Sequence, residues 1–341
     1  MFLDPSDLTD SPSVETGEQQ EWHPEIAFWM WFSVNLICSL SCAVLNCAFS
    51  LVSIVERHRV FKNSFFVIVI FLSVSIAVDN VGTIVYLFVV ALAGVESGAV
   101  NMFSALLDLS FSYYSTLLIF FMGLNRFAAF SSPYLKDLLM ERKTLLWMLS
   151  GLLVFSIVVS VTVYKLSGME RVYDQGDMND YADHLLLIQV SNYVFYAIPL
   201  TSTIFYLLAF NSLRSQRGNA ISGATKSLLD KAEKGTLKMG IWILVVYIIA
   251  LVIHVVMGAL SPDGFSYVLL SCLQTLTATA PQIGLPLSVV VCSKDARSAA
   301  KHICFMSVKS YLTSAFHLKK SRTSSASSHK TIPLTLEIDT K

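Results

Sequence analysis

The sequence has little charge. Only 14% of its 341 residues are Asp, Glu, Lys or Arg, and 54% are hydrophobic, whereas roughly a quarter of a soluble domain is charged. Acidic and basic residues are equal in number, and no basic stripe or nucleic-acid-binding motif occurs, so nucleic acid is not an expected partner. The six cysteines lie in or beside apolar runs, which excludes a small disulfide-stapled fold. The composition predicts a membrane protein.

Three further features are missing. No Lys or Arg precedes the first apolar run, so no cleavable signal peptide is expected and the first helix would act as its own insertion signal. No Asn-x-Ser/Thr acceptor for N-glycosylation occurs. No internal repeat is visible, which disfavours transporters built from duplicated halves.

Seven apolar runs are long enough to cross a bilayer. A hydrocarbon core of roughly 30 Å needs about 20 apolar residues in helical form, because lipid offers no partners for unpaired backbone groups. The runs cover residues 26–55, 64–92, 100–130, 144–164, 185–213, 239–260 and 265–292. The sequence therefore predicts an all-α, seven-transmembrane helix bundle over residues 26–292.

Basic residues lie in alternate connections. The first, third and fifth connections, the inner end of the third run and the tail carry 22 of the 24 Lys and Arg residues. The other side carries Lys165 and Arg171 among 14 acidic residues. Because Lys and Arg gather on the cytoplasmic side, we expect an extracellular amino terminus, with an acidic segment over residues 1–25, and a cytoplasmic carboxyl terminus.

The segment after the last run has two parts. Residues 293–318 have the spacing of an amphipathic helix lying on the inner leaflet, with Cys304 as a candidate palmitoylation site. Residues 319–341 are rich in Ser, Thr and Lys, without apolar periodicity, which predicts a disordered tail. Its serines and threonines beside basic residues are candidate targets of kinases, and arrestin is an expected partner there.

Charged groups within the runs are functional candidates, because an ionisable side chain at mid-membrane costs about 2.5–3.5 kcal/mol on insertion scales. Asp108 and Arg126 are separated by 18 residues, or five helical turns, so they share one face of the third helix about 27 Å apart. Asp108 would lie near the outer mouth of the bundle and Arg126 at the inner edge. The alternative is that Asp108 caps or solvates the bundle and Arg126 extends to the inner headgroups.

Asp79 lies near the middle of the second run. A buried carboxylate must be neutralised, hydrogen-bonded or paired with a cation, and Asn46 and Ser115 are expected neighbours. These three residues form a candidate sodium or proton site. A structural polar network that orders helix packing is an equal alternative.

Aromatic and amide side chains gather near the predicted outer ends of the helices. Such groups can line a cavity open to the outside, because pockets in helical bundles are largely apolar with a few polar anchors. The candidate ligand-binding residues are Asp108, Ser112, Tyr113, Asn192, Tyr196, Tyr267 and Gln274.

The end of the third run carries a family resemblance. Residues 124–134 read Leu-Asn-Arg-Phe-Ala-Ala-Phe-Ser-Ser-Pro-Tyr. This segment resembles the Asp-Arg-Tyr region of rhodopsin-like G-protein-coupled receptors, and Arg126 and Pro133 keep that family's seven-residue offset. The form Asn-Arg-Phe, followed by Ala-Phe and Pro, is most similar to the nematode serpentine chemoreceptors of classes gamma, V, X and T.

Single positions elsewhere agree with the resemblance or depart from it. The positions similar to family landmarks in helices one, two, five and seven are Asn46, Asp79, Pro199 and Pro286. Leu285 and Val289 replace the Asn and Tyr of the helix-seven motif. The helix-six Cys-Trp-x-Pro motif is absent, and no cysteine is available for the family's extracellular disulfide. These departures fit a divergent chemosensory receptor better than an aminergic or peptide receptor.

The resemblance implies a receptor in the plasma membrane, in the cilia of sensory neurons, that binds a small extracellular molecule and activates a heterotrimeric G protein. The residues implied in coupling are Asn125, Arg126, Phe127, Pro133 and Pro286. Asn125 cannot form the salt bridge of an aspartate, so a weak resting lock and basal activity are expected. Asp108 lies at the position where amine receptors hold the ligand ammonium, so a cationic ligand is one hypothesis.

Other functions compete with this interpretation. A ligand-gated channel or transporter with seven helices is the main alternative. An intramembrane aspartyl protease using Asp79 and Asp108 is disfavoured because the Gly-x-Gly-Asp context is missing, so no enzymatic activity is expected. Only His254 lies well inside a run and the last run has no Lys, so neither a metal nor a retinal cofactor is expected.

Overall fold

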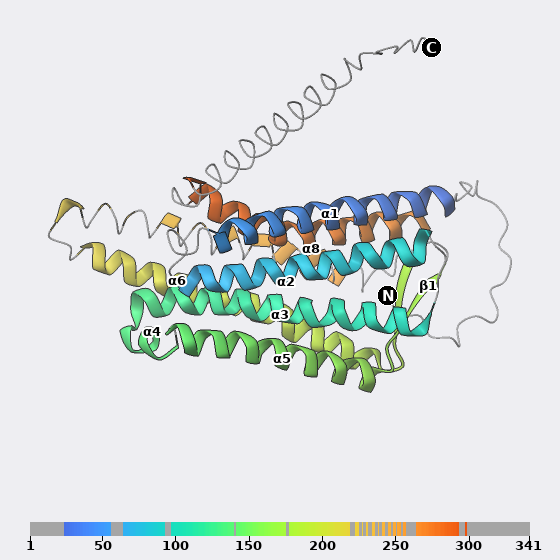
Figure 1. The fold of residues 1–341 in the computed structure, drawn as a ribbon, viewed down its shortest axis with the longest axis horizontal. Helices are drawn as coiled ribbons and strands as arrows, with labels where there is room; N and C mark the ends of the chain where they lie inside the picture. Colours follow the sequence, from blue (N-terminus) through green and yellow to red (C-terminus); the bar gives the residue numbers. More distant parts are fainter. Residues whose placement is uncertain are drawn as a thin grey trace, which may run out of the picture. The chain divides into compact units, whose positions relative to one another are not determined.

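The computed structural model describes residues 24–55, 64–92, 97–139, 141–174, 177–218 and 264–292, scattered residues between 222 and 256, and residues 297–298. Residues Met1–Cys292 form one compact unit, which contains every helix discussed below (Figure 1). The acidic segment before Pro24, the predicted amphipathic helix and tail apart from residues 297–298, and Cys304 lie outside the described residues.

Six of the predicted runs are long helices. They are α1 (Pro24–Val55), α2 (Ser64–Tyr86), which continues as the π-helical segment η2 (Leu87–Leu92), α3 (Gly98–Ser131), α5 (Arg142–Ser167), α6 (Leu185–Gly218) and α8 (Gly264–Cys292). A short helix, α4 (Pro133–Leu139), follows α3. In the region of the sixth run, residues 241–242, 245–246, 248–249, 251–253 and 255–256 are helical.

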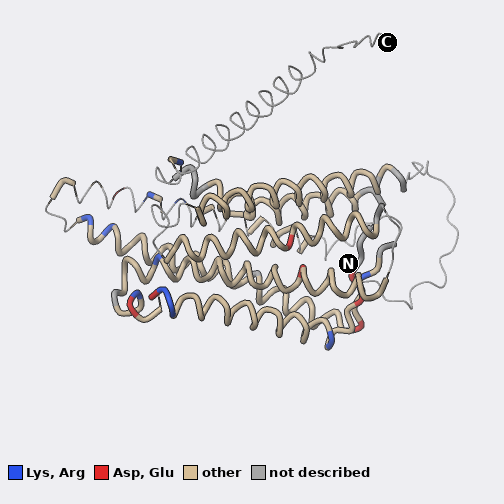
Figure 2. Tube along the Cα trace, viewed as in Figure 1, with Lys and Arg blue, Asp and Glu red and all other residues tan. Residues whose placement is uncertain are grey.

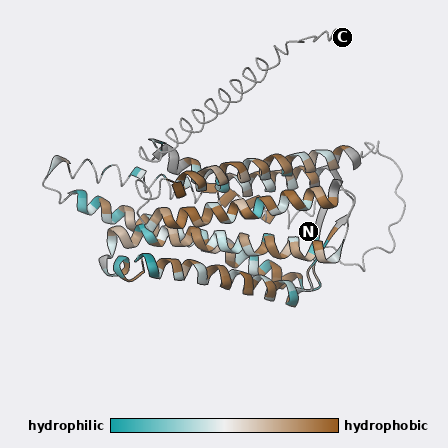
Figure 3. Ribbon diagram, viewed as in Figure 1, coloured by the Kyte–Doolittle hydropathy of each residue, from teal (hydrophilic) through white to brown (hydrophobic). Residues whose placement is uncertain are grey.

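Five helices of the described part are long and apolar enough to cross a membrane: α1, α2 with η2, α3, α5 and α6. Helix α5 makes the case most clearly, because only 22% of its most apolar window is buried. Trp147 is 81% exposed, and Val154, Phe155 and Val158 are exposed along the same helix. Figure 3 shows that the middle of this helix is mostly hydrophobic. An apolar surface of this extent needs lipid to cover it. The protein is an α-helical membrane protein.

Helix α3 lies at the centre of the packing. It contacts α2, α5 and α6, while α1 packs against α2 and α8. A Cβ at Gly123 would lie 2.6 Å from Oγ and 2.9 Å from the carbonyl oxygen of Ser202, so α3 and α6 approach each other almost backbone to backbone. The apolar core between α2, α3 and α5 includes Ile68, Leu118 and Leu149.

Charged side chains are concentrated at the two ends of the bundle. Figure 2 shows long helical stretches without Lys, Arg, Asp or Glu between these ends. Within the described spans, Asp79 and Asp108 are the acidic exceptions, as the sequence indicates. This distribution is the one expected of helices whose middle parts lie in hydrocarbon.

A β-hairpin follows α5 and was not predicted. Strands β1 (Glu170–Asp174) and β2 (Asp177–Tyr181) pair antiparallel, with Arg171 opposite Asp180. The prediction of an all-α protein is therefore correct for the spans but incomplete for this connection, which the sequence presented only as an acidic loop. Period-two patterning over five residues is too short to distinguish a strand from a loop.

The two ends of the connection that carries the hairpin lie next to each other. Gly168 ends α5 in the left-handed conformation, with φ of 61°, and a Cβ there would also collide with the carboxylate of Asp183. The backbone N–H of His184 donates to the carbonyl of Ser167 at 3.0 Å. The chain thus leaves α5, forms the hairpin and returns beside its starting point to enter α6.

Candidate functional site

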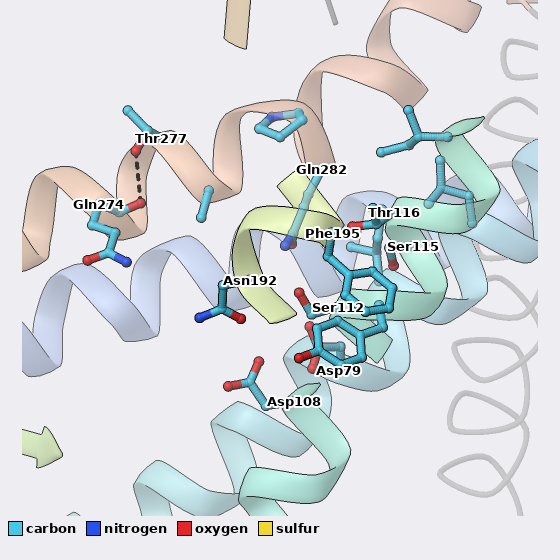
Figure 4. Close-up of a pocket in the computed structure, with 16 residues that line it drawn as sticks. Asp79, Asp108, Ser112, Ser115, Thr116, Asn192, Phe195, Gln274, Thr277 and Gln282 are labelled. Atoms are coloured by element: carbon cyan, nitrogen blue, oxygen red, sulfur yellow. Dashed lines mark hydrogen bonds between the residues drawn. The ribbon is translucent and has the colours of Figure 1, made fainter. Parts of the chain in front are cut away.

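A cavity of about 280 Å³ lies inside the bundle between α2, α3, α6 and α8. Ligand pockets of drug-sized molecules measure about 300–1,000 Å³, so this cavity suits a smaller molecule. Its polar lining groups approach from all four helices (Figure 4). They include Asp79, Asp108, Ser112, Asn192, Gln274 and Gln282.

Five of the seven predicted ligand-binding residues line this cavity: Asp108, Ser112, Tyr113, Asn192 and Gln274. The side chains of Tyr196 and Tyr267 lie outside the described part of the chain. The sequence did not single out Phe195 or Gln282. Gln282 carried a signal, since an amide between Pro281 and Pro286 is unusual in an apolar run.

One wall of the cavity is aromatic. The rings of Tyr113 on α3 and Phe195 on α6 stack with centroids 3.6 Å apart and planes 5° from parallel. The hydroxyl of Tyr113 hydrogen-bonds Ser191 at 2.8 Å. Tyr113 therefore offers the cavity part of its ring, while its hydroxyl serves the contact between α3 and α6.

The predicted sodium or proton site is only partly assembled. Asp79 and Ser115 both line the cavity, but Ser115 hydrogen-bonds Ser75 at 3.1 Å. Asn46 donates to the carbonyl of Gln282 at 3.2 Å. Oδ1 of Asp79 is buried and accepts no hydrogen bond from any described residue. The carboxylate thus faces the cavity without the protein partners that the sequence suggested.

Gln282, on α8, joins α1 to α2 beside Asp79. Its Oε1 accepts a hydrogen bond from Nδ2 of Asn80 at 2.9 Å, while its carbonyl accepts the bond from Asn46. Asn80 follows Asp79 in α2, and the side chains of Asn46 and Asn80 are both buried. This arrangement agrees with the alternative that the polar residues here order the packing of α1, α2 and α8.

Asp108, in the first third of α3, does not stand alone. Its Oδ2 accepts a hydrogen bond from Nη2 of Arg171, in strand β1, at 3.1 Å. The same guanidinium donates to both oxygens of Asp180, from Nε at 2.7 Å and from Nη2 at 2.9 Å. Nη1 of Arg171 donates to Ser104 at 3.1 Å. The side chain of Arg171 is only 3% exposed, against 48% for Asp108.

The pKa of Arg171 reflects this network. Burial lowers it, but the hydrogen bond and charge of Asp180, and then those of Asp108, outweigh burial and raise the pKa above its ordinary value. Arg171 is therefore a permanent cation shared by two carboxylates. Asp108, the residue of the cationic-ligand hypothesis, is thus already paired in part with the hairpin.

Arg126, near the carboxyl-terminal end of α3, has a different environment. Its guanidinium carbon lies 3.6 Å from the centroid of the Phe65 ring, on α2. Its Nε is buried and donates no hydrogen bond to any described residue. No ion pair joins it to an Asp or Glu of the described residues within 4.0 Å. A cation–π contact thus holds this arginine.

Three other predicted coupling residues lie close to Arg126 in the sequence. Nδ2 of Asn125 donates to Oγ of Ser64 at 2.8 Å, so Asn125 ties α3 to the start of α2. Phe127 packs against Phe205 of α6, with centroids 5.6 Å apart. Pro133 is the first residue of α4, where its missing N–H costs nothing. The side chain of Pro133 lies outside the described part.

The carboxyl-terminal ends of α3 and α6 are also joined. The carbonyl of Phe130 accepts hydrogen bonds from Ser212 at 2.9 Å and from Gln216 at 2.7 Å. These contacts were not anticipated, because a backbone carbonyl gives no sequence signal. They connect the segment that follows Arg126 to the helix that ends in the basic fifth connection.

Helix α8 continues through Pro281 and Pro286 as one element, and Pro286 is buried. Gly284, between the two prolines, lies against Trp242 from the sixth run. A Cβ at Gly284 would lie 2.5 Å from Nε1 of that indole. The absence of a side chain at this position allows the indole to touch the helix backbone.

Comparison with known proteins adds no identity: no family model matches the sequence, and no curated protein is significantly similar to it.

Proposed function

We propose that this protein is a chemosensory G-protein-coupled receptor with seven spans, an extracellular amino terminus and a cytoplasmic carboxyl terminus. A small molecule binds in the cavity beside Asp108, and the opposite end of the bundle activates a heterotrimeric G protein. The proposed location is the plasma membrane of sensory-neuron cilia.

The observation that carries the proposal is the construction of α3. One helix contributes Asp108, Ser112 and Tyr113 to a cavity, and further along it holds an arginine without an acidic partner among the described residues. A ligand can shift a conformational equilibrium only by its differential affinity for the two states. A helix that contacts both the ligand and the signalling face can convert such a difference into output.

A channel or transporter has its own supporting observation. Four buried side-chain oxygens on α1 and α2 have no hydrogen-bond partner among the described residues: Oδ1 of Asn46 and the hydroxyls of Ser50, Ser53 and Ser73. Buried polar groups of this kind attract water. A hydrated polar path between α1 and α2 would serve ion or proton movement.

The test is expression in a heterologous cell with a panel of small chemicals, recording second messengers and membrane current in parallel. The receptor proposal expects second-messenger responses that Arg126→Ala abolishes while surface expression stays normal. Ligand-evoked current that Arg126→Ala leaves intact would support the channel instead. An amino-terminal epitope that antibodies fail to reach in intact cells would contradict the proposed orientation.

A further inference from the structure

The guanidinium of Arg171 connects the β-hairpin to the carboxylate that lines the cavity. Arg171 lies opposite Asp180 in the hairpin register, and it contacts both oxygens of that residue. This half of the network is internal to the hairpin. The other half reaches α3 through single hydrogen bonds to Asp108 and Ser104.

The network carries one positive and two negative charges. Oδ1 of Asp108 accepts no hydrogen bond from the described residues, and the side chain is 48% exposed. The residual negative charge therefore lies on the group that faces the cavity. A cavity with the Asp108 carboxylate in its wall attracts a cation.

The hairpin can separate from α3 without an unpaired charge of its own. If Arg171 releases Asp108, it keeps its two contacts to Asp180, and the pair remains neutral. The carboxylate of Asp108 then needs a new counter-ion, because an unpaired charge in a desolvated site is costly. A ligand ammonium supplies one.

From this geometry we propose that Arg171 is a tethered cation that competes with a cationic ligand for Asp108. The hairpin thereby sets both the access to the cavity and its selectivity for charge. The ligand class is a small organic monocation, such as a primary amine or a quaternary ammonium. The inference rests on the proposed orientation, in which the hairpin is extracellular, and does not require G-protein coupling.

The experiment uses a cysteine placed in the cavity. Ser112→Cys in the full chain is exposed on intact cells to two membrane-impermeant methanethiosulfonates, one bearing a trimethylammonium group and one a sulfonate. Each reagent forms a mixed disulfide with the thiolate and releases methanesulfinate. The chain with Ser112 intact gives the background from the native cysteines. The measured quantity is the rate of modification.

Arg171→Gln, in the Ser112→Cys chain, should raise the rate with the cationic reagent about tenfold, because a competing charge is removed. The rate with the anionic reagent should not rise, because the loss of Arg171 makes the cavity more negative. Asp108→Asn should abolish the preference for the cationic reagent. Equal cationic rates with and without Arg171→Gln would overturn the proposal, as would a Ser112→Cys thiol that reacts in no variant.

Asp180→Asn separates competition from general loosening of the hairpin. It removes the negative charge of Asp180 while keeping one acceptor oxygen, so Arg171 has Asp108 as its remaining charged partner in this network, and modification by the cationic reagent should become several-fold slower than in the unmodified hairpin. A hairpin that merely unfolds in both variants would make both faster, and that result would also contradict the proposal. Surface labelling confirms that each variant reaches the membrane. The measured quantity is a chemical rate and needs no G protein. If the rates change as expected but no second-messenger response occurs, only the proposed G-protein coupling is contradicted.

Discussion

Two arginines lie toward opposite ends of α3, and they are held in opposite ways: Arg171 reaches the helix from strand β1, and Arg126 belongs to the helix itself. Arg171 at one end donates to two carboxylates and a hydroxyl, whereas Arg126 at the other end lies over an aromatic ring and has no acidic partner among the described residues. Breaking a buried ion pair strands a charge, and the cost falls on the partner left behind. Removing the arginine from a cation–π contact leaves only an apolar ring behind. The contacts of Arg171 with Asp180 suit an anchor inside the hairpin, and the cation–π contact of Arg126 suits a group that is released when the bundle changes arrangement.

The largest expected effect is the loss of the anchor. Arg171→Ala leaves Asp108 and Asp180 without a counter-charge. Removing one partner of a buried pair costs about 3–5 kcal/mol, and the partial exposure of both carboxylates, 48% and 29%, reduces this to about 1–3 kcal/mol. The melting temperature of the detergent-purified protein should fall accordingly.

Arg126→Ala is the matched comparison. It orphans no carboxylate of the described residues, so its melting temperature should fall less than that of Arg171→Ala. A larger fall for Arg126→Ala would show that Arg126 contributes more to the stability of the fold than Arg171 does, and would reverse the comparison.

The next effect concerns the aromatic partner. Phe65→Leu removes the ring but keeps an apolar side chain, and a cation–π contact is worth about 1 kcal/mol. Under the proposed function, ligand-independent second-messenger output should rise about fivefold, as that energy implies. Phe65→Tyr keeps the ring face and should stay near the native level. Unchanged output in Phe65→Leu would show that the contact between Phe65 and Arg126 does not stabilise the inactive arrangement.

A neutral contact between the two ends gives a reference value. Asn80→Ala deprives Oε1 of Gln282 of its donor, and the loss of one hydrogen bond costs about 1 kcal/mol. The melting temperature should fall by less than for Arg171→Ala. A double variant with leucine at both positions, Asn80→Leu with Gln282→Leu, leaves neither amide of this pair unsatisfied and should melt at a higher temperature than the Asn80→Ala protein. A double variant less stable than the Asn80→Ala protein would indicate that these amides do more than satisfy each other.

The smallest effect is expected at an exposed ion pair. Asp230 accepts hydrogen bonds from Arg217 at 2.8 Å and Lys234 at 2.9 Å, and the contact with Lys234, followed by that with Arg217, lowers the pKa of Asp230 despite some desolvation. The stabilisation is present above the ordinary pKa of the carboxyl and is lost as the pH falls through the lowered pKa. Because the Asp230 carboxylate is exposed, Asp230→Asn should barely change the melting temperature at neutral pH. The melting temperatures of the native protein and of Asp230→Asn, plotted against pH, should become equal in acid. A fall at neutral pH as large as that of Arg171→Ala would mean that burial does not explain the difference.

Length and apolarity predict the helices well. A span leaves a signal of about 20 residues, and each long helix begins and ends within a few residues of its predicted run. The helical period also relates Asp108 to Arg126 along α3, because that relation is local. The gathering of Asp108, Ser112, Asn192 and Gln274 around one cavity follows from their predicted depth in the bundle.

The partners of these charges could not be predicted. Arg171 and Asp108 are 63 positions apart, and the five-residue strand that positions Arg171 is too short for a reliable pattern. The sequence has 22 phenylalanines, and only packing decides that Phe65 is the one beneath Arg126. Such contacts depend on how helices are placed against each other, which periodicity does not encode.

The indole of Trp242 against Gly284 has an optical consequence. Indole emission depends on the polarity around the ring, so a change in the spacing between the sixth run and α8 would shift the fluorescence of Trp242. Trp147, which is exposed on α5, would keep a constant emission in the hydrocarbon. The native protein therefore contains both a reporter and a reference chromophore, and replacing the other tryptophans with phenylalanine would make helix movement visible without an attached dye.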